Sequence, residues 1–346
     1  MNRAMIAVLV VGLALAVAVS VLAERFHVRA LLGLSTSGLC VVQPATDVTP
    51  GTWKSGASMP VIRSELTSIA QGDQVYVVGG ITRDGGSDSL EIYDPATDSW
   101  QTGASLPNPM HHNGIASDSE RLYVSGGYTS LDYHVVLDGL WAYDPAADSW
   151  TQIATLPEPR AAHTMDYIDG KLYIVGGVGQ DPTQVWAYDL ATDTWDTSLA
   201  PLPTEREHLT SVVVDGKLYV IGGRINVDGG QRNLSANEMY DPQTDTWTHL
   251  TDMPTPRGGL AASVIDGRIH VAGGEISNPA CAFNRHEVYD PQTDTWAVGP
   301  DLPVARHGMA SASLGDSWYL IGGSTGAGGH TLATLNDQVF IFTPNA

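Results

Sequence analysis

Arginine recurs at one fixed place along this chain of 346 residues, three positions after a proline. Five of the six copies of this Pro-x-x-Arg pattern carry it, and Met110 stands in the remaining copy. A guanidinium has five donors in a planar fork, so it either grips an anionic ligand or hydrogen-bonds backbone carbonyls of a neighbouring segment. The spacing is compatible with both roles. As ligand-binding residues the candidates are Arg63, Arg160, Arg206, Arg257 and Arg306.

Acidic and imidazole side chains that occur in only one copy accompany these arginines. A residue repeated in every copy generally serves the fold, whereas a unique residue is freer to serve function. Glu207 follows Arg206 directly, and Arg224 and Glu275 follow paired glycines. A glutamate beside an arginine suits general acid–base chemistry on an acidic ligand, so Glu207, Glu275 and His208 are the catalytic candidates. The other unique residues are Glu65, His111, His112, His163, Arg224 and His307. All of them except Glu65 are ligand-binding candidates.

The histidines also raise the question of a metal site. His111, His163, His208 and His307 would meet at a metal ion only if all four pointed inward. The chain has no His-x-His or other tight His/Cys spacing to support such a site. We therefore predict neither a metal ion nor a cofactor.

The composition narrows the class of protein that positions these residues. The 37 glycines and 20 prolines exclude a coiled coil, because neither residue is tolerated in long helices. An apolar content of 43% excludes a disordered chain. The formal charge of −21 argues against a nucleic-acid partner, which requires a basic surface.

Four features repeat together with a period near 50 residues. An apolar run that ends in a glycine pair, a tryptophan, and the proline of the Pro-x-x-Arg pattern each occur six times, and a Tyr-Asp turn occurs five times. Such a period is typical of a β-propeller. The glycine pairs begin at Gly79, Gly126, Gly176, Gly222, Gly273 and Gly322, and the tryptophans are Trp53, Trp100, Trp150, Trp195, Trp247 and Trp296.

The Gly-Gly pair, the Tyr-Asp-Pro-x-Thr-Asp-x-Trp segment and the following Leu-Pro-x-x-Arg resemble the kelch repeat. The resemblance covers residues 51–346 and implies an all-β, six-bladed propeller of four-stranded meanders around a central channel. The last copy stops at Pro344 without its tryptophan strand, and Trp53 has no copy before it. We therefore expect Thr52–Ser55 to complete the sixth blade and close the ring.

The amino terminus carries a separate signal. Residues 4–23 are an unbroken apolar stretch about as long as a membrane is thick. We interpret residues 1–23 as an apolar helix, either a cleaved signal peptide or an uncleaved membrane anchor, and residues 24–50 as a linker. Both alternatives place the propeller outside the cytoplasm. There Cys40 and Cys281 could pair in a disulfide, or remain unpaired.

For a kelch-like propeller, two kinds of function stay open. One is a monomeric module that binds a protein or glycan ligand, an anionic one included, through the loops at one mouth of the channel. The other is an enzyme, for which the fold resembles sialic-acid mutarotase (N-acetylneuraminate epimerase) and, less closely, galactose oxidase. An enzyme requires a deep pocket that holds a Glu or His with a perturbed pKa within reach of an Arg. A binding module would instead show a shallow face rich in Tyr and Arg.

Overall fold

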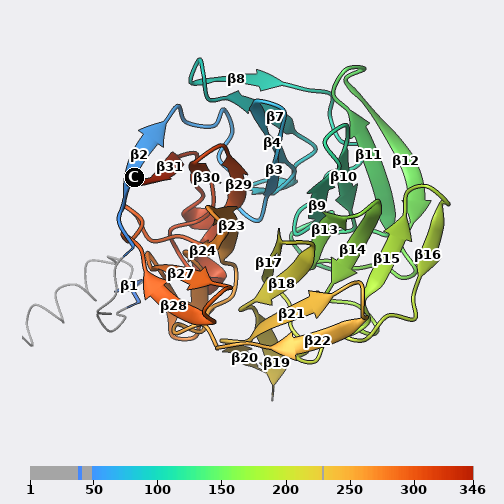
Figure 1. Cartoon of the computed structure of the whole chain (residues 1–346). Coiled ribbons are helices and arrows are strands. Elements are labelled where there is room, and N and C mark those ends of the chain that lie inside the picture. Colours follow the sequence, from blue (N-terminus) through green and yellow to red (C-terminus); the bar gives the residue numbers. More distant parts are fainter. Residues whose placement is uncertain (1–37, 41–48, 228–229, 346) are drawn as a thin grey trace, which may run out of the picture. The chain divides into compact units, whose positions relative to one another are not determined.

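The computed structural model describes residues 38–40, 49–227 and 230–345. Within them, six antiparallel four-stranded sheets follow one another as blades around a central channel (Figure 1). The first strand of each blade lies beside the channel and contacts the first strands of the neighbouring blades. The blades are β3 (Thr67–Gln71), β4 (Gln74–Val78), β7 (Leu90–Asp94) and β8 (Ser99–Thr102); β9 (Gly114–Ser117), β10 (Leu122–Ser125), β11 (Gly139–Asp144) and β12 (Ser149–Thr155); β13 (Thr164–Ile168), β14 (Lys171–Val175), β15 (Trp186–Asp189) and β16 (Thr194–Asp196); β17 (Thr210–Val214), β18 (Lys217–Ile221), β21 (Asn237–Asp241) and β22 (Thr246–His249); β23 (Ala261–Ile265), β24 (Arg268–Ala272), β27 (His286–Asp290) and β28 (Thr295–Val298); and β29 (Ala310–Leu314), β30 (Ser317–Ile321), β31 (Val339–Pro344) and β2 (Gly51–Gly56).

Blade six is completed from the other end of the propeller. Strand β2 pairs antiparallel with β31, with Trp53 opposite Phe342. The Trp53 ring also packs against Trp318, at a ring-centroid distance of 5.7 Å. The predicted closing strand is thus confirmed, and β31 has partners on both sides instead of an open edge.

The repeated Tyr-Asp turn ties each blade to the preceding one. In blade one the Tyr93 hydroxyl donates to Asp98 Oδ1, which also accepts the backbone N–H of Ala57. The indole N–H of Trp100 donates to the carbonyl oxygen of Ala57. Asp98 therefore serves the fold, as the repetition indicates. The same tyrosine–aspartate bond recurs at Tyr143–Asp148, Tyr188–Asp193, Tyr240–Asp245 and Tyr289–Asp294.

Each glycine pair follows the second strand of a blade, at a point where the backbone of two other loops approaches closely. Gly80 has a φ of 103°, and a Cβ there would lie 2.9 Å from the carbonyl oxygen of Ser64. Its N–H donates to the carbonyl oxygen of Met110, in the loop that leads into the next blade. Only glycine combines this left-handed backbone with so close an approach.

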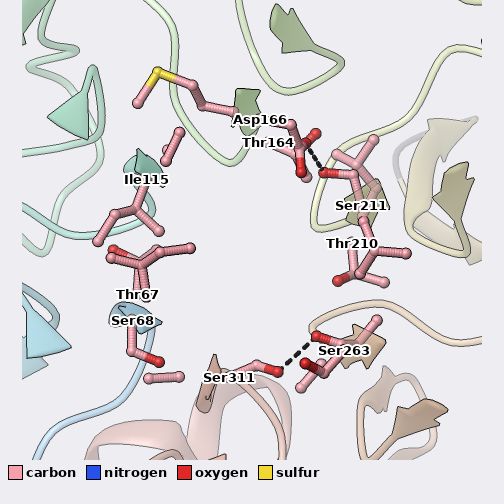
Figure 2. Close-up of a pocket in the computed structure, with 18 of the residues that line it drawn as sticks. Thr67, Ser68, Ile115, Thr164, Asp166, Thr210, Ser211, Ser263 and Ser311 are labelled. Atoms are coloured by element: carbon pink, nitrogen blue, oxygen red, sulfur yellow. Dashed lines mark hydrogen bonds between the residues drawn. The ribbon is translucent and has the colours of Figure 1, made fainter. Parts of the chain in front are cut away.

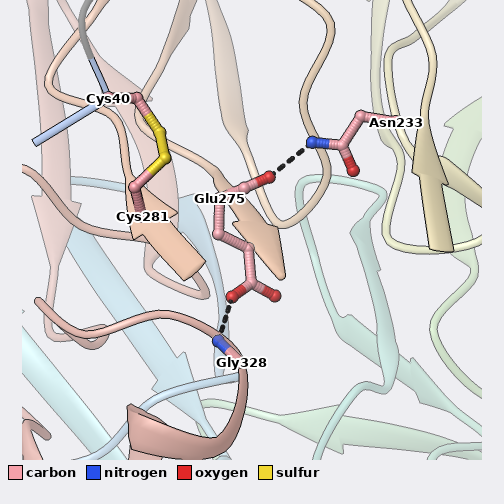
Figure 3. Close-up of a disulfide and its surroundings, with 5 residues drawn as sticks. All are labelled: Cys40, Asn233, Glu275, Cys281 and Gly328. Carbon is pink, nitrogen blue, oxygen red and sulfur yellow. Dashed lines mark hydrogen bonds between the residues drawn. A yellow bond between two sulfur atoms is a disulfide. The ribbon is translucent and has the colours of Figure 1, made fainter. Parts of the chain in front are cut away.

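Shorter elements extend from the loops. They are the hairpins β5 (Ile81–Thr82) with β6 (Gly85–Gly86), β19 (Arg224–Val227) with β20 (Gly230–Asn233) and β25 (Glu275–Ser277) with β26 (Ala280–Ala282), the 3-10 helix η1 (Gly328–Ala333), and β1 (Gly38–Leu39). Cys40 and Cys281 form a disulfide (Figure 3), so of the two alternatives for these cysteines the structure has the paired one.

The predicted apolar helix of residues 1–23 and most of the linker lie outside the described residues. In the part of the chain that the structure does describe, no helix has the length and apolar character needed to cross a membrane.

Candidate functional site

Six residues, one from each blade, form a closed ring of backbone hydrogen bonds at one end of the channel. Each lies two positions after the recurring arginine or its methionine substitute, and its N–H donates to the carbonyl oxygen of the equivalent residue in the preceding blade. The six N···O distances are 2.7–3.1 Å. We call this set the loop ring; its members are Glu65, His112, Ala162, His208, Gly259 and Gly308.

All six residues of the loop ring have a positive φ, between 52° and 63°. Glycine adopts this conformation freely, and the chain uses it at Gly259 and Gly308. For Glu65, His112 and His208 the same backbone costs about 1 kcal/mol or more each. Strained residues concentrate at functional sites, so the placement of three polar side chains where the backbone favours glycine indicates function.

The loop ring bounds a cavity that occupies the channel. Its volume is about 440 Å³, and its lining includes the six first strands together with Glu65, His112 and His208. Hydroxyl-bearing side chains point into it from several blades, among them Thr67 and Ser263 (Figure 2). The cavity therefore offers hydroxyl groups between apolar ones, which suits a small hydroxyl-rich molecule.

Seven charged or titratable side chains form a second closed ring at the same mouth. Arg224 donates from Nε to Glu207 Oε1 at 2.8 Å and from Nη1 to Glu275 Oε1 at 2.6 Å. The second oxygen of Glu275 accepts the N–H of Gly328 at 2.7 Å (Figure 3). We call this set the mouth cycle; it consists of Glu207, Arg224, Glu275, His307, Glu65, His112 and His208.

The remaining contacts of the mouth cycle run through imidazoles. His307 lies 3.6 Å from Glu275 through Nε2 and 3.3 Å from Glu65 through Nδ1. Glu65 Oε2 is 3.4 Å from Nε2 of His112, which is 3.0 Å from Nε2 of His208. Finally, Nδ1 of His208 donates to Glu207 Oε2 and closes the cycle.

The mouth cycle holds its members in different protonation states. Burial favours the neutral form of His307, but the carboxylates of Glu275 and Glu65 outweigh it and raise its pKa to about 8. Burial would raise the pKa of Glu207, yet His208 and Arg224 lower it to about 2. For His112, burial dominates and holds the pKa well below its usual value. A proton-bearing imidazole, a neutral imidazole and ionised carboxylates are thus in contact.

Most of the unique residues singled out in the sequence meet here. Glu207, Glu275, His208, His112, Arg224 and His307 are all in the mouth cycle, and His111 adjoins it, with Nδ1 2.6 Å from Nδ1 of His112. Of the two glutamate–arginine pairs that the sequence suggests, Glu275 with Arg224 is present, whereas Glu207 pairs with Arg224 and not with its neighbour Arg206. His163 is not part of the mouth cycle; it lines the channel cavity and is bonded through Nε2 to the hydroxyl of Ser125.

Glu65 belongs to the site although it was not among the predicted site residues. It is an acid unique to its copy at the loop-ring position, and this is the signal that could have identified it. Its side chain is 10% exposed and contacts both His112 and His307. Burial would raise its pKa, but the neighbouring imidazoles hold the pKa well below its usual value.

The five recurring arginines do not reach the mouth. All are at most 1% exposed and lie within or between blades. Arg257, for example, donates to the buried Glu287 at 2.7 Å and to the carbonyl oxygen of Val271. Arg63, Arg160, Arg206 and Arg306 likewise donate to carbonyl oxygens or to buried acids or amides. This placement favours the structural role over an anion-binding ring.

An aromatic group adjoins the mouth cycle. The Tyr133 ring, 48% exposed, lies 5.1 Å from the ring of Tyr128 and 5.8 Å from that of His112. Tyr133 also has a positive φ of 58°. It offers the mouth a flat apolar surface with a hydroxyl at its edge.

Known proteins share this fold. A solved structure described as "Structure of YjhT" superposes with a TM-score of 0.68 at 19% identity and covers 82% of this chain and 95% of its own. An F-box/kelch-repeat protein of Arabidopsis thaliana is 41% identical over 56 residues, 15% of each chain. Alpha-scruin of Limulus polyphemus is 42% identical over 59 residues, 16% of this chain. The matched segments span only 15% and 6% of the lengths of these two relatives.

Two family descriptions match the chain itself. The KLHDC2/KLHL20/DRC7 Kelch-repeats domain matches residues 154–323. The Attractin/LZTR1 beta-propeller matches residues 45–226, more than half of the chain. Together with six blades that each carry a glycine pair and a Tyr-Asp turn or its equivalent, these matches show that the chain belongs to the kelch-repeat β-propeller family.

Proposed function

We propose that the chain binds a free sugar at the mouth cycle and interconverts its anomers by proton transfer. The observation that carries this proposal is the chain of contacts from Arg224 through Glu207 to His208, which lines the channel cavity. A perturbed acid thus lies within reach of an arginine and next to a residue of the cavity wall, as an enzyme of this kind requires.

The proposed reaction requires only proton transfers. Opening a sugar ring requires one group that accepts the proton of the anomeric hydroxyl and another that donates a proton to the ring oxygen. Glu207 and His208 share a hydrogen bond, so a sugar bound against them meets an acceptor and a donor together. Arg224, fixed between two carboxylates, positions Glu207.

The charge of the site selects among sugars. Arg224, His307 and His208 each already contact a carboxylate of the protein within the mouth cycle. None of them is left to hold the carboxylate of an acidic sugar, so the site favours a neutral sugar, unlike the acidic substrate of the mutarotases that the fold resembles. The exposed ring of Tyr133 supports a sugar ligand, because the apolar face of a pyranose stacks on such a surface.

The alternative is binding without chemistry, by a protein- or carbohydrate-binding module. The exposed Tyr133 on the mouth loops favours this alternative, since aromatic residues of this kind are typical of recognition surfaces. We also propose an extracytoplasmic location. The disulfide between Cys40 and Cys281 supports it, because such bonds persist in oxidising compartments.

Anomer exchange measured by NMR on the full chain tests the proposal. A panel of neutral and acidic free sugars is mixed with catalytic amounts of protein, and we expect faster exchange for at least one neutral sugar. The Glu207→Gln variant should lose at least tenfold of this acceleration. Glu120→Gln, at an exposed position outside the site, is the matched control and should retain it. Sugar binding without acceleration would contradict the enzyme and leave the binding module.

A further inference from the structure

We infer that Glu65, His112 and His208 form a binding site for one divalent transition-metal ion, with zinc as the probe. Their ligand atoms are Glu65 Oε2 and the two Nε2 atoms, and all three lie within 4.8 Å of one another. Two imidazoles and one carboxylate are a donor set that Zn²⁺ and related ions bind readily. This site goes beyond the proposed sugar chemistry and does not depend on it.

The hydrogen bonds of the two histidines determine where their lone pairs point. Nδ1 of His208 donates its proton to Glu207, so a neutral His208 carries a lone pair on Nε2. Nε2 of His111 donates to the carbonyl oxygen of Ser130 at 3.1 Å, which leaves Nδ1 of His111 as an acceptor. The proton between His111 and His112 therefore belongs to Nδ1 of His112, and Nε2 of His112 carries the lone pair.

Three electron pairs consequently converge on one point. Nε2 of His112 and Nε2 of His208 face each other at 3.0 Å, and the carboxylate oxygen of Glu65 is 3.4 Å from the former. Three acceptors at this separation repel one another unless a cation lies among them. A proton on His208 would satisfy one contact, whereas a metal ion satisfies all three.

The spacing also suits a metal. Tetrahedral ligands about 2.1 Å from zinc lie about 3.4 Å from one another, close to the two distances observed here. The outer contacts match those of metal-bound histidines, which donate their second N–H to a carboxylate or another acceptor. Glu207 provides this contact for His208, and His111 provides it for His112.

The loop ring leaves one side of the site open. The three other ring positions are Ala162, Gly259 and Gly308, whose side chains are minimal. All three also line the cavity. Three protein ligands with an open position toward a cavity are typical of catalytic zinc sites, where water or a substrate oxygen occupies the fourth position.

Metal binding is measured directly on the full chain, stripped with chelator and titrated with ZnCl₂ in the absence of sugar. We expect one tightly bound zinc per chain and a higher melting temperature in its presence. In ¹⁵N spectra of the histidines, the Nε2 resonances of His112 and His208 should move to metal-bound values while both Nδ1 atoms stay protonated. Because zinc and a proton compete for Nε2 of His208, the sugar assays are run on chelator-treated protein, which keeps the two proposals separable.

Variants at the loop ring remove ligands without changing the backbone. His208→Gly and His112→Gly place at these positions the residue that the chain has at Gly259 and Gly308, and each should weaken zinc binding at least a hundredfold. Ala162→Gly is the matched ring control, and His249→Ala tests the exposed His249–Asp252 pair; both should bind zinc as the natural chain does. The inference would be overturned if the natural chain did not bind zinc stoichiometrically or if the Nε2 resonances did not move on zinc addition. It would also be overturned if both glycine variants bound zinc as tightly as the natural chain.

Discussion

Nε2 of His208 lies 3.0 Å from Nε2 of His112, although the two residues are 96 positions apart and precede the first strands of two different blades. Blade three stands between these blades and contributes only Ala162 to the loop ring. The side chain of alanine is too small to separate the imidazoles. The contact therefore depends on the small side chain of Ala162 in blade three as well as on the two histidines of the neighbouring blades.

Two glycines of the loop ring provide a matched test of its backbone. At Gly259 an added Cβ would meet no atom closer than 3.5 Å, so Gly259→Ala should cost only the strain of the positive φ, about 1 kcal/mol. At Gly308 the Cβ would lie 2.3 Å from Glu65 Oε1, so Gly308→Ala should cost more and displace Glu65. Denaturant unfolding of both variants measures the difference. Equal losses would argue against this ring geometry.

Closure of the propeller by β2 predicts a large effect at the amino end of the ring. Trp53 packs against Trp318 and Phe342, and its indole N–H donates to the carbonyl oxygen of Pro300. Trp53→Ala should lower the free energy of unfolding by about 3 kcal/mol, and Trp53→Phe by less. Deletion of residues 50–58 should lower the melting temperature sharply, since it exposes the edge of β31. An unchanged melting curve after the deletion would contradict closure.

The buried arginines should affect stability and not ligand binding. Arg257→Ala leaves the buried Glu287 with only Thr255 and the more distant Arg285, which should cost about 3 kcal/mol. The double variant Arg257→Met with Glu287→Leu should recover part of this loss, because no charge then stays buried alone. Denaturant unfolding, together with binding measurements on the acidic sugars of the panel, separates the two roles for both variants. Loss of ligand binding in a double variant of natural stability would support the anion-binding role instead.

A histidine pair far from the mouth predicts how stability depends on pH. Nδ1 of His270 lies 2.9 Å from Nε2 of His286, whose Nδ1 donates to the carbonyl oxygen of Pro300. Burial, with a smaller effect of Arg268, lowers the pKa of His270 to about 4. Burial, with smaller effects of His270 and Arg257, holds the pKa of His286 well below its usual value.

In the unfolded chain both imidazoles titrate near pH 6.5. Below that pH the unfolded state binds protons that the folded state does not bind. The free energy of unfolding is therefore highest above pH 6.5 and decreases as the pH is lowered toward 4. The loss at pH 5 should be about 2 kcal/mol for His270, and His286 should add a loss of the same sign. Unfolding free energies measured at pH 7 and pH 5 should differ less in the His270→Gln, His286→Gln double variant. The same pH dependence in the variant would show that other groups cause it.

Much of the fold could be predicted because repeated local sequence patterns specify it. The glycine pairs, the Tyr-Asp turns and the tryptophans act within one blade or between adjacent blades, so their period alone reveals six blades. Closure by β2 could be predicted from counting, since one tryptophan strand lacked a blade and one blade lacked its strand. The burial of the recurring arginines could not be decided, because a guanidinium suits an anion and a carbonyl equally well.

The site was predicted as a set of residues and not as an arrangement. The sequence alone predicts the kelch architecture and shows that Glu207 and Glu275 have no counterpart at the equivalent position of the other copies, because repetition separates the residues of the fold from the rest. The folded structure adds that Glu207 pairs with Arg224, that Glu65 belongs to the site, and that His112 and His208 face each other. Glu65 contacts His112 and His307 of two other blades, and His112 meets His208 of a third, whereas Glu207 and Arg224 both lie in blade four. The distances between blades follow from the closure of the loop ring, a property of all six blades together that no single repeat contains.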